Sequence, residues 1–591
     1  MADPMKLSDY VIDFLKAEGI DHGYFMIGGA LGHIADSCHR NGIKLFTMHH
    51  EQAAAFAAEG QAIVTSKMGF AMATSGPGAT NLITGIGSAY FASLPVLYIT
   101  GQVNTFESNL SGKRRQVGFQ ETDIVSMIKN VTKYAVLVDD PKTIAYHLEK
   151  AVFLARNGRM GPVLIDLPFN IQGADIDTSH LVQFRGSDEE KALASKDEFH
   201  KDVIERVAEM IKAAERPLIL VGHGAKLSHC EEQVIELVRV AQIPVVSTLL
   251  GTDVFPNDNP LYFGFIGTYG QRFSNFAVAN SDLIIVLGSR LDSRQTGVKW
   301  GFFAPMAKII HVDADPNELE ATVHETVSIK GDCRRFLSAF LRELKPQKER
   351  SEWVKFLLWL KKTYPEVKQD IASGAISPIE AIRMISSKST RPIFVAADVG
   401  SNQMWFAQAW TARKGQVIAT NGGMGPMGYS LPVSIGACLS NQGMEAISFC
   451  GDGGMQINIQ ELQTIRRHNL PVKIVILNNS SLGMLTQFQT ENFEGRLIGS
   501  VEGYDAPDFV KVASAYGIPS RRSSKSSSLS GDIDWLLSEK GPALLEVMIP
   551  RNFWVLPKSV FSRPVFDMKP FLEEAELEKA LKYVDKKKIG K

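Results

Sequence analysis

The sequence has few cysteines, almost no net charge and no long apolar run. Its five cysteines are widely spaced and form no Cys-x-x-Cys pair, which favours reduced thiols in a cytoplasmic protein. Lysine and arginine (63) balance aspartate and glutamate (64), so neither a nucleic acid nor an anionic membrane is expected as a partner. No apolar stretch reaches membrane-spanning length, and no basic segment followed by an apolar one opens the sequence. We therefore expect a cytoplasmic protein without a membrane span.

What the sequence does contain is ordinary for a globular protein with a large core. Of its 591 residues, 45% are hydrophobic and 21% are charged, and the length predicts two to four domains. Short apolar strands alternate with helical patterns, which predicts an α/β fold of three doubly wound parallel sheets. The boundaries that we predict are 5–185, 203–345 and 355–560, with a polar linker or exposed helix start at 186–202 and a charged tail at 561–591.

The strands that we expect are short apolar runs, several of which end in turn-forming residues. They lie at 69–74, 96–100, 163–167, 217–222, 283–288, 309–313, 446–450 and 472–478. An amphipathic helix is expected at 7–18 and a helix at 571–583 in the tail, which could lie over the entrance to a site.

The most informative motif is a carboxylate between glycines at the end of one strand, followed by paired amides at the end of the next. Asp452 stands in the run 451–453, and Asn479 is the second of the two amides. About one β-helix-β crossover separates them, and ligands bind where parallel strands end. The oxygens suit Mg²⁺ or Ca²⁺ holding a diphosphate, and Gly453 and Gly454 let the backbone approach phosphate oxygens. The alternative is an ordinary strand-turn-helix.

A second candidate acid lies far upstream, at the start of an alanine-rich helix. Glu51 opens the run 51–60, in which small side chains permit close helix packing. We expect Glu51 to be buried, with a raised pKa that lets it hold or donate a proton. The alternative is a carboxylate favoured only by the helix dipole. His49 and His50 precede it and could relay protons or simply pack.

Seven segments in a fixed order resemble one known family. With them the chain is similar, over nearly its whole length, to the acetohydroxyacid (acetolactate) synthase branch of thiamine diphosphate (ThDP)-dependent 2-oxoacid enzymes, of the catalytic large-subunit type. The segments are 27–29, 50–52, 74–78, 118–123, 288–294, 421–428 and the Asp452 and Asn479 motifs together. Residues 118–125 and 132–135 also resemble acetolactate-synthase-like proteins encoded in bacterial surface-polysaccharide clusters.

The resemblance implies a pyrimidine-binding first domain, a Rossmann-like central domain and a diphosphate-binding third domain. It also implies a homodimer or homotetramer in which ThDP lies between the first domain of one subunit and the third domain of another. Asp452, Asn479 and the Ser481 carbonyl would hold Mg²⁺. Gly425 would accept the 4′-amino group, and Met427 would lie beneath the V-shaped cofactor. The remaining ThDP contacts implied are Gly451, Gly453, Gly454, Ser481, Gly483, Met484, Pro77 and Asn81.

On the substrate side, the resemblance assigns catalytic or pocket roles to residues of the first domain. Glu51 would bond N1′ of the aminopyrimidine and cycle its proton. The other residues implied are Gln120, Gly29 and Phe119 for catalysis and Gly28 and Phe488 for the substrate pocket. Phe119 is alternatively core packing. Phe488 departs from the family, which typically carries tryptophan there, and this weakens the case for an enzyme dedicated to branched-chain amino acids.

The central block carries loops that resemble the FAD-contacting loops of the same family. The residues are Gly267, Thr268, Gly288, Arg290 and Asp313. These positions are strand-end loops with a carboxylate for ribose and an arginine for diphosphate. In the alternative, Arg290 or Arg294 forms a structural salt bridge and no flavin binds.

The function implied is ThDP-dependent decarboxylation of a 2-oxoacid, with pyruvate the simplest case. The acyl-anion (hydroxyethyl) unit would pass to a second carbonyl, either another 2-oxoacid or a keto-sugar nucleotide. Alternatives are a simple decarboxylase, a flavin-linked oxidase, and a catalytically silent subunit. Retention of Glu51, Asp452 and Asn479 argues against the silent subunit.

Overall fold

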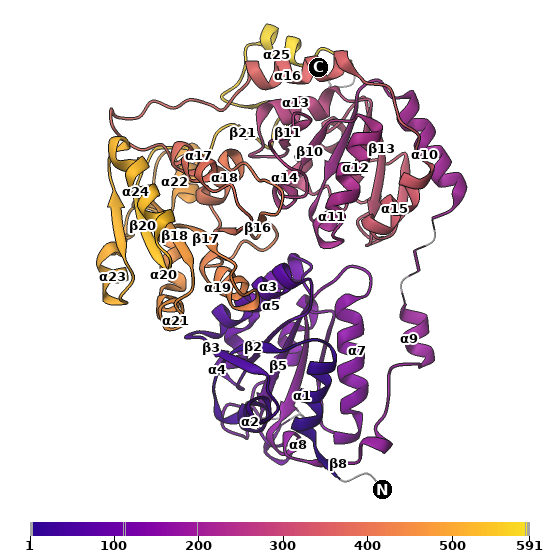
Figure 1. The fold of residues 1–591 in the computed structure, drawn as a ribbon, viewed down its shortest axis with the longest axis vertical. Coiled ribbons are helices and arrows are strands. Elements are labelled where there is room, and N and C mark those ends of the chain that lie inside the picture. Colours follow the sequence, from indigo (N-terminus) through magenta and orange to yellow (C-terminus); the bar gives the residue numbers. More distant parts are fainter. Residues whose placement is uncertain are drawn as a thin grey trace.

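Three parallel six-stranded sheets build the molecule, as the alternating pattern predicted (Figure 1). The computed structural model describes residues 4–109, 112, 114–194, 196–197, 199–585 and 587. Part of the linker (195 and 198) and the last tail residues (586 and 588–591) therefore lie outside the described residues. In the part of the chain that is described, no helix combines the length and the apolar character needed to cross a bilayer.

The first sheet has the strand order β3-β2-β4-β5-β7-β6, in which neighbours are parallel. Its strands are β3 (Lys44–Thr47), β2 (His22–Met26), β4 (Gly69–Ala73), β5 (Val96–Gln102), β7 (Val163–Pro168) and β6 (Tyr134–Leu137). Its main helices are α1 (Leu7–Ala17), α2 (Gly32–Arg40), α3 (Glu51–Thr65), α4 (Pro77–Asn81), α5 (Ile83–Phe91), α6 (Ile124–Ile128), α7 (Ile144–Arg156) and α8 (Phe169–Gln172). The sheet is apolar on both faces because helices cover both.

The central sheet has the order β11-β10-β9-β12-β13-β14. Its strands are β11 (Tyr262–Phe265), β10 (Val245–Ser247), β9 (Pro217–Val221), β12 (Leu283–Leu287), β13 (Lys308–Asp313) and β14 (Val327–Lys330). Its main helices are α10 (Lys201–Ala213), α11 (His223–Leu227), α12 (Glu231–Ala241), α13 (Arg272–Asn280), α14 (Ser293–Thr296), α15 (Cys333–Glu343) and α16 (Ser351–Thr363). Before it, the expected linker contains one short helix, α9 (Asp188–Leu193).

The third sheet has the order β16-β15-β17-β18-β20-β19. Its strands are β16 (Val417–Ala419), β15 (Phe394–Ala397), β17 (Ala446–Gly451), β18 (Val472–Asn478), β20 (Ala543–Met548) and β19 (Ser520–Ser523). Its main helices are α17 (Pro378–Lys388), α18 (Ser401–Ala409), α19 (Ser430–Ser440), α20 (Asp452–Ile457), α21 (Leu462–Arg467), α22 (Gly483–Asn492), α23 (Phe509–Ala515) and α24 (Ser526–Ser538).

Helices α3 and α19 join the first and third sheets through small residues (Figure 1). A Cβ placed on Gly60 would lie 2.2 Å from the Val433 carbonyl oxygen, and one on Gly436 would lie 1.9 Å from that of Ala57. The two backbones therefore touch, and no larger side chain fits at either glycine without moving them. This contact fixes the middle of α3, the helix that begins with Glu51, against α19. Below, the domains built on the first and third sheets are called the first-sheet unit and the third-sheet unit.

The tail packs on the central sheet. Two residues of α13 hold it. Arg272 donates a hydrogen bond to the Pro570 carbonyl oxygen (2.6 Å), and Asn280 donates one to the Ala580 carbonyl oxygen (2.8 Å). The tail helix α25 (Glu574–Ala580) is shorter than the helix expected at 571–583. It begins where acidic residues stand in its first turn, which the helix dipole favours.

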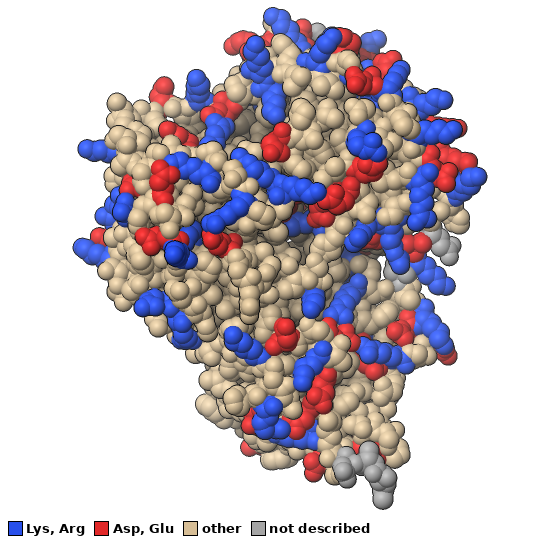
Figure 2. Space-filling view, viewed as in Figure 1, with Lys and Arg blue, Asp and Glu red and all other residues tan. Residues whose placement is uncertain are grey.

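Charged residues of both signs are interspersed on the face seen in Figure 2. This distribution agrees with the formal net charge of −1.

Candidate active site

Strands β17 and β18 are hydrogen-bonded neighbours, which brings their carboxyl ends together as the spacing predicted. The Ser481 backbone N–H lies 3.2 Å from both Asp452 Oδ2 and Asn479 Oδ1, so these two oxygens converge. Asn478, the other amide of the pair, instead donates to Glu546 at 2.7 Å and serves the sheet. Among the paired amides, only Asn479 faces the candidate metal position.

The Asp452 carboxyl is buried, with 2% of the residue exposed. Burial raises its pKa to about 6, although the Tyr504 hydroxyl and backbone N–H groups oppose the rise. The Ser481 hydroxyl is also buried and has no hydrogen-bond partner among the described residues. Among the described residues, no group of three or more His, Cys, Asp or Glu side chains could hold a metal ion, and the donors here are one carboxylate plus neutral oxygens. That donor set fits a hard divalent cation that keeps other oxygen ligands.

Glycines around this position leave the backbone free of side chains. A Cβ on Gly453 would lie 2.5 Å from Leu482 Cδ2, and one on Gly454 would lie 2.9 Å from Asp398 Oδ2. A Cβ on Gly483 would lie 2.6 Å from Asn479 Nδ2. Any side chain at these positions would displace its neighbours, whereas the bare backbone leaves room for a ligand to approach.

The loop 421–428 lies beside these glycines and contains two left-handed turns, at Gly425 (φ +68°) and Gly428 (φ +79°). The Met427 methyl group would lie 3.1 Å from a Cβ on Gly453, so it packs against the glycine-rich turn. Together these elements enclose a cavity of about 550 Å³. Its lining includes these residues expected at the ThDP site: Gly425, Met427, Gly451, Asp452, Gly453, Gly454, Asn479, Ser481, Gly483 and Met484.

The first-sheet residues expected at the site form a separate cluster in this single chain. Glu51 is 7% exposed, as expected for the alanine-rich helix, and its Oε2 accepts from Asn81 Nδ2 at 2.9 Å. Pro77 begins α4, directly after Gly76 with φ +63°. Among the described residues that line the 550 Å³ cavity, none comes from the first-sheet unit.

The expected substrate residues differ in their surroundings. Gly28 is crowded, because a Cβ there would lie 2.4 Å from Thr74 Cβ, whereas a Cβ on Gly29 would meet nothing within 4 Å. Gln120 has φ +64° and packs against Gly76. Phe119 is 86% exposed, so the core-packing alternative does not hold within this single chain.

On the third-sheet side, Phe488 of α22 is 44% exposed and makes an edge-to-face contact with Phe493. Phe488 does not line the 550 Å³ cavity, whereas Met484, one turn earlier on the same helix, does.

Three buried polar residues at this site were not singled out from the sequence. Asp398 accepts from the Gly428 N–H at 3.2 Å, and Asn421 accepts from the Gly425 N–H at 2.9 Å, so both hold the loop 421–428. Glu461 accepts from the His49 N–H at 2.9 Å, which holds the chain just before Glu51. Their only sequence signal is position: Asp398 follows an apolar strand, Asn421 opens the segment 421–428 that carries the resemblance, and Glu461 follows the Asp452 motif.

The two histidines before Glu51 have different surroundings. His50 Nδ1 accepts from the Gln52 N–H at 3.1 Å and so caps α3. The His49 ring contacts Arg467, and burial together with this cation lowers the pKa of His49. His50 therefore has a structural role at the start of the helix.

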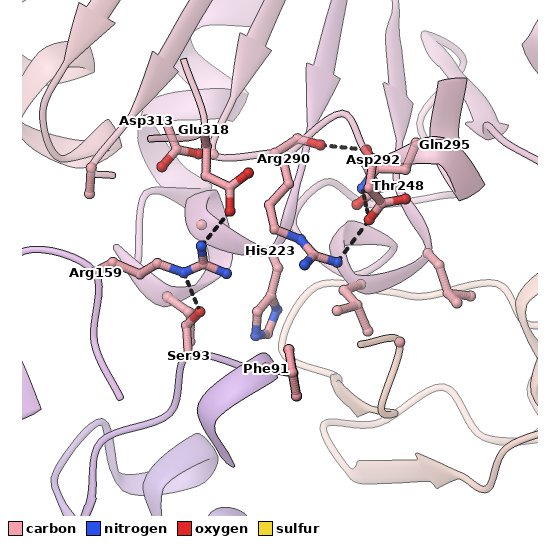
Figure 3. Close-up of a pocket in the computed structure, with 18 of the residues that line it drawn as sticks. Phe91, Ser93, Arg159, His223, Thr248, Arg290, Asp292, Gln295, Asp313 and Glu318 are labelled. Atoms are coloured by element: carbon pink, nitrogen blue, oxygen red, sulfur yellow. Dashed lines mark hydrogen bonds and ion pairs between the residues drawn. The ribbon is translucent and has the colours of Figure 1, made fainter. Parts of the chain in front are cut away.

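The carboxyl ends of β9, β12 and β13 surround a second cavity, of about 260 Å³. Thr268, Gly288, Arg290 and Asp313 line it, and Gly267 does not. Figure 3 shows His223 between Arg159 and Arg290, whose guanidinium groups are held by carboxylates.

Two arginines of this second cavity, Arg159 and Arg290, already form ion pairs with carboxylates. Arg290 donates to Asp292 at 2.8 Å, and Arg159, from the first-sheet unit, contacts Glu318 at 2.5 Å. Asp313 is buried, which raises its pKa. The donors suit the ribose and diphosphate of a nucleotide, since an arginine and a strand-end carboxylate are present. Arg294 lines this cavity and the 550 Å³ cavity, and so connects the two.

Comparison with known proteins accounts for this arrangement. Residues 5–127, 204–340 and 398–547 match the N-terminal TPP binding domain, the central domain and the C-terminal TPP binding domain of thiamine pyrophosphate enzymes. The chain is 35% identical over 554 residues to a "Probable acetolactate synthase large subunit" of Methanocaldococcus jannaschii, covering 92% of each chain. This chain belongs to the acetolactate synthase family of ThDP enzymes.

Other relatives of the family cover the chain as fully. The "Acetolactate synthase isozyme 2 large subunit" of Escherichia coli is 33% identical, covering 93% of this chain and 97% of its own. The chloroplastic acetolactate synthase of Arabidopsis thaliana is 34% identical, covering 94% of this chain and 83% of its own. The α/β fold with three parallel sheets and the ThDP-binding domains are therefore those of an acetolactate synthase-like enzyme.

Proposed function

We propose that this protein decarboxylates pyruvate, or a closely related 2-oxoacid, and joins the two-carbon unit to a second carbonyl. The observation that carries the proposal is the convergence of Asp452 and Asn479 beside the glycine-rich cavity, in a chain of this family. Bound ThDP supplies a nucleophilic carbon and an electron sink for loss of CO2. With two pyruvates the balance is one acetolactate and one CO2.

In this proposal, Asp452, Asn479 and the Ser481 carbonyl hold Mg²⁺, which holds the diphosphate. The unpartnered Ser481 hydroxyl and the raised pKa of Asp452 support a cation at this position, since a cation would offset the cost of burying the carboxylate. The carbonyl of Gly425 accepts from the 4′-amino group, and Met427 supports the bend of the cofactor. The close approaches at Gly453 and Gly454 support a ligand against the bare backbone.

Glu51 is proposed as the residue that exchanges a proton with N1′ of the aminopyrimidine. Its burial and its hydrogen bond from Asn81 give it a fixed position suited to this exchange. Gln120, Gly29 and Phe119 are proposed to face the reacting 2-oxoacid, with Gly28 at the back of the pocket and Phe488 on the opposite wall. A hydrogen-bond donor such as Gln120 would stabilise a developing alkoxide.

We propose that the active site is completed by a second copy of the chain, in a homodimer or a tetramer. The cavity that would hold the diphosphate contains no described first-sheet residue, yet the first sheet carries Glu51. Large apolar side chains are exposed on both the first-sheet unit and the third-sheet unit. They are Met26, Ile27, Phe106 and Phe119 on the first-sheet unit and Met424, Ile457, Leu485, Phe488 and Ile498 on the third. Patches of this kind indicate interaction surfaces.

FAD is proposed in the central cavity, with Asp313 toward the ribose and Arg290 toward the diphosphate. The cavity lies at the carboxyl ends of β9, β12 and β13, the usual position for a nucleotide on a parallel sheet.

We also propose a cytoplasmic location. Five free, buried cysteines support it, because thiols stay reduced there.

The proposed acceptor is a second 2-oxoacid or a keto-sugar nucleotide. The resemblance of residues 118–125 and 132–135 to surface-polysaccharide cluster proteins favours the keto sugar. Phe488 in place of the typical tryptophan weakens the case for an enzyme dedicated to branched-chain amino acids. The test is product analysis by mass spectrometry with pyruvate alone and with pyruvate plus candidate keto sugars. Acetolactate from pyruvate alone supports self-ligation, and a branched sugar formed only with the keto sugar supports the second acceptor. Aldehyde release without any ligation would support a simple decarboxylase, and peroxide formation a flavin-linked oxidase.

A further inference from the structure

A buried side chain holds the turn that contains Gly425 from within the loop. Asn421 is 1% exposed, and its Oδ1 accepts from the Met424 N–H (3.1 Å) and from the Gly425 N–H (2.9 Å). These two bonds orient successive peptide planes just where the backbone enters the left-handed conformation. The Asn421 amide therefore fixes the peptide plane that leads into Gly425, next to the plane that carries the Gly425 carbonyl.

The Asn421 amide is held in turn by a helix of the first-sheet unit. Its Nδ2 donates to Ser88 Oγ on α5 at 2.7 Å, and both residues are buried. Gln403 fixes the Asn421 backbone by donating to its carbonyl oxygen at 3.0 Å. The Ser88 hydroxyl, which accepts from Asn421, still has its own proton to donate.

A buried carboxyl lies next to that hydroxyl. Glu59 is fully buried and stands two turns after Glu51 on the same helix, α3. The groups that face its carboxyl are the hydroxyls of Ser88 (α5) and Tyr429 (start of α19), with Tyr98 (β5) nearby. No cation is among them, and no hydrogen bond of normal geometry reaches either carboxyl oxygen from the described residues.

These surroundings favour the neutral form of Glu59. Burial raises its pKa to about 8, while the Ser88 and Tyr429 hydroxyls oppose the rise. A protonated carboxyl offers an acceptor to the Ser88 hydroxyl and a donor to a tyrosine hydroxyl, whereas an ionised carboxylate can only accept. Ionisation would place an unpaired charge in an apolar interface and would change the partner that Ser88 can use.

We propose that Asn421 is a positioning residue for the cofactor-binding turn at Gly425, and that Ser88, which faces the buried Glu59 carboxyl, holds Asn421 in place. The inference rests on the proposed function, since it gives the Gly425 carbonyl a ligand. It goes further by joining that turn to the helix that begins with Glu51. In the proposed dimer, Gly425 and Glu51 of one chain belong to different active sites, so this network would link a residue of one site to a residue of the other.

The first experiment is a double-mutant cycle on the full-length protein with Mg²⁺ present. ThDP affinity is titrated by intrinsic fluorescence, and kcat and the pyruvate KM are measured for Asn421→Ala, Ser88→Ala and the double variant. We expect Asn421→Ala to weaken ThDP binding about tenfold or more and Ser88→Ala about threefold to fivefold, with the pyruvate KM little changed. The double variant should be no worse than Asn421→Ala, because the two residues act through one bond.

The matched control is Ser37→Ala. It removes a buried serine hydroxyl that donates to Ser8 at 2.8 Å, away from the loop, and should leave ThDP affinity unchanged. Ser88→Ala removes a single hydroxyl and keeps the test decisive if Asn421→Ala does not fold. Additive effects in the cycle, or wild-type ThDP affinity in Ser88→Ala, would overturn the inference.

The second experiment tests the protonation state of Glu59. Glu59→Gln keeps a neutral acceptor and donor of the same size, so it should retain ThDP affinity at pH 7, whereas Glu59→Ala should lose it. Wild-type ThDP affinity should fall above about pH 8, and this fall should be absent in Glu59→Gln. An identical fall in Glu59→Gln, or loss of affinity at pH 7, would contradict the neutral form. If the wild type bound no ThDP at all, the proposed function itself would fail.

Discussion

Replacing Asp452 by asparagine should stabilise the protein without cofactor and remove its response to Mg²⁺ and ThDP. Asp452 is 2% exposed, and burial raises its pKa from 3.8 to about 6. Its folded-state pKa lies above the unfolded one, so the carboxyl costs stability as pH rises from about 4 to about 6. Above pH 6 this cost is constant.

The size of the effect follows from that difference. A difference of about two pKa units corresponds to about 3 kcal/mol at pH 7, which Asp452→Asn should recover in the cofactor-free protein. Its melting temperature should rise by about several degrees at pH 7.5, and the gain should shrink towards pH 4.5. Bound ligand at 100 times its Kd adds about 2.7 kcal/mol to the wild type, and this increment should be lost in the variant.

The assay is thermal unfolding at several pH values, with and without saturating Mg²⁺ and ThDP. Asp166→Asn is the matched control, because Asp166 is 1% exposed and burial raises its pKa to about 7. Asp166 lies in the first sheet, where it accepts from Thr100 and Gln102, so that variant should keep the full ligand response. An Asp452→Asn protein that is no more stable than the wild type, and that still responds to Mg²⁺ and ThDP, would refute the reasoning.

Three further predictions concern other parts of the site. Glu51→Gln should abolish turnover while ThDP affinity stays within about tenfold, measured by titration and CO2 release, because the amide keeps the bond to the cofactor but cannot cycle its proton; loss of binding would instead mean a structural glutamate. Gly267→Ala should abolish flavin absorbance: Gly267 does not itself line the cavity, but at its φ of +108° a Cβ would lie 2.4 Å from the carbonyl oxygen of Arg294, which does line it. Gly301→Ala, in open space, should keep the absorbance, and equal flavin content in both variants would contradict the assignment. Phe119→Asp should shift the protein towards monomer in sedimentation analysis and reduce activity at low concentration, because 86% of this side chain is exposed in one chain; an unchanged dimer would remove Phe119 from the interface.

Much of the fold could be predicted because buried parallel strands leave a strong local signal. The strand expected at 472–478 is β18 (Val472–Asn478), and the one expected at 446–450 is β17 (Ala446–Gly451). The distance between them in sequence is about one β-helix-β crossover, which predicts that the two strands are neighbours. The sequence therefore predicted that Asp452 and Asn479 lie close together. The burial of Glu51 followed from the alanine-rich helix that packs closely on α19.

The rest depended on contacts between residues far apart in sequence. Asn421 and Ser88 are separated by more than three hundred residues, and neither position shows a local pattern that indicates its partner. The crowding at Gly28 arises from Thr74 on the neighbouring strand, so the sequence alone could not show that only Gly29 is open. The tail was expected near a site entrance, but its place on the central sheet is set by side chains of α13, such as Arg272.

The most direct test is to incubate the purified protein with ThDP, Mg²⁺ and carbon-13-labelled pyruvate and to follow CO2 and products by mass spectrometry. The proposed function predicts ThDP-dependent CO2 release, with one acetolactate per CO2 when pyruvate is the only acceptor. If a keto sugar is the true acceptor, ligation appears once it is added. Failure to release CO2 from pyruvate or any other 2-oxoacid in the presence of ThDP and Mg²⁺ would contradict the decarboxylating carboligase.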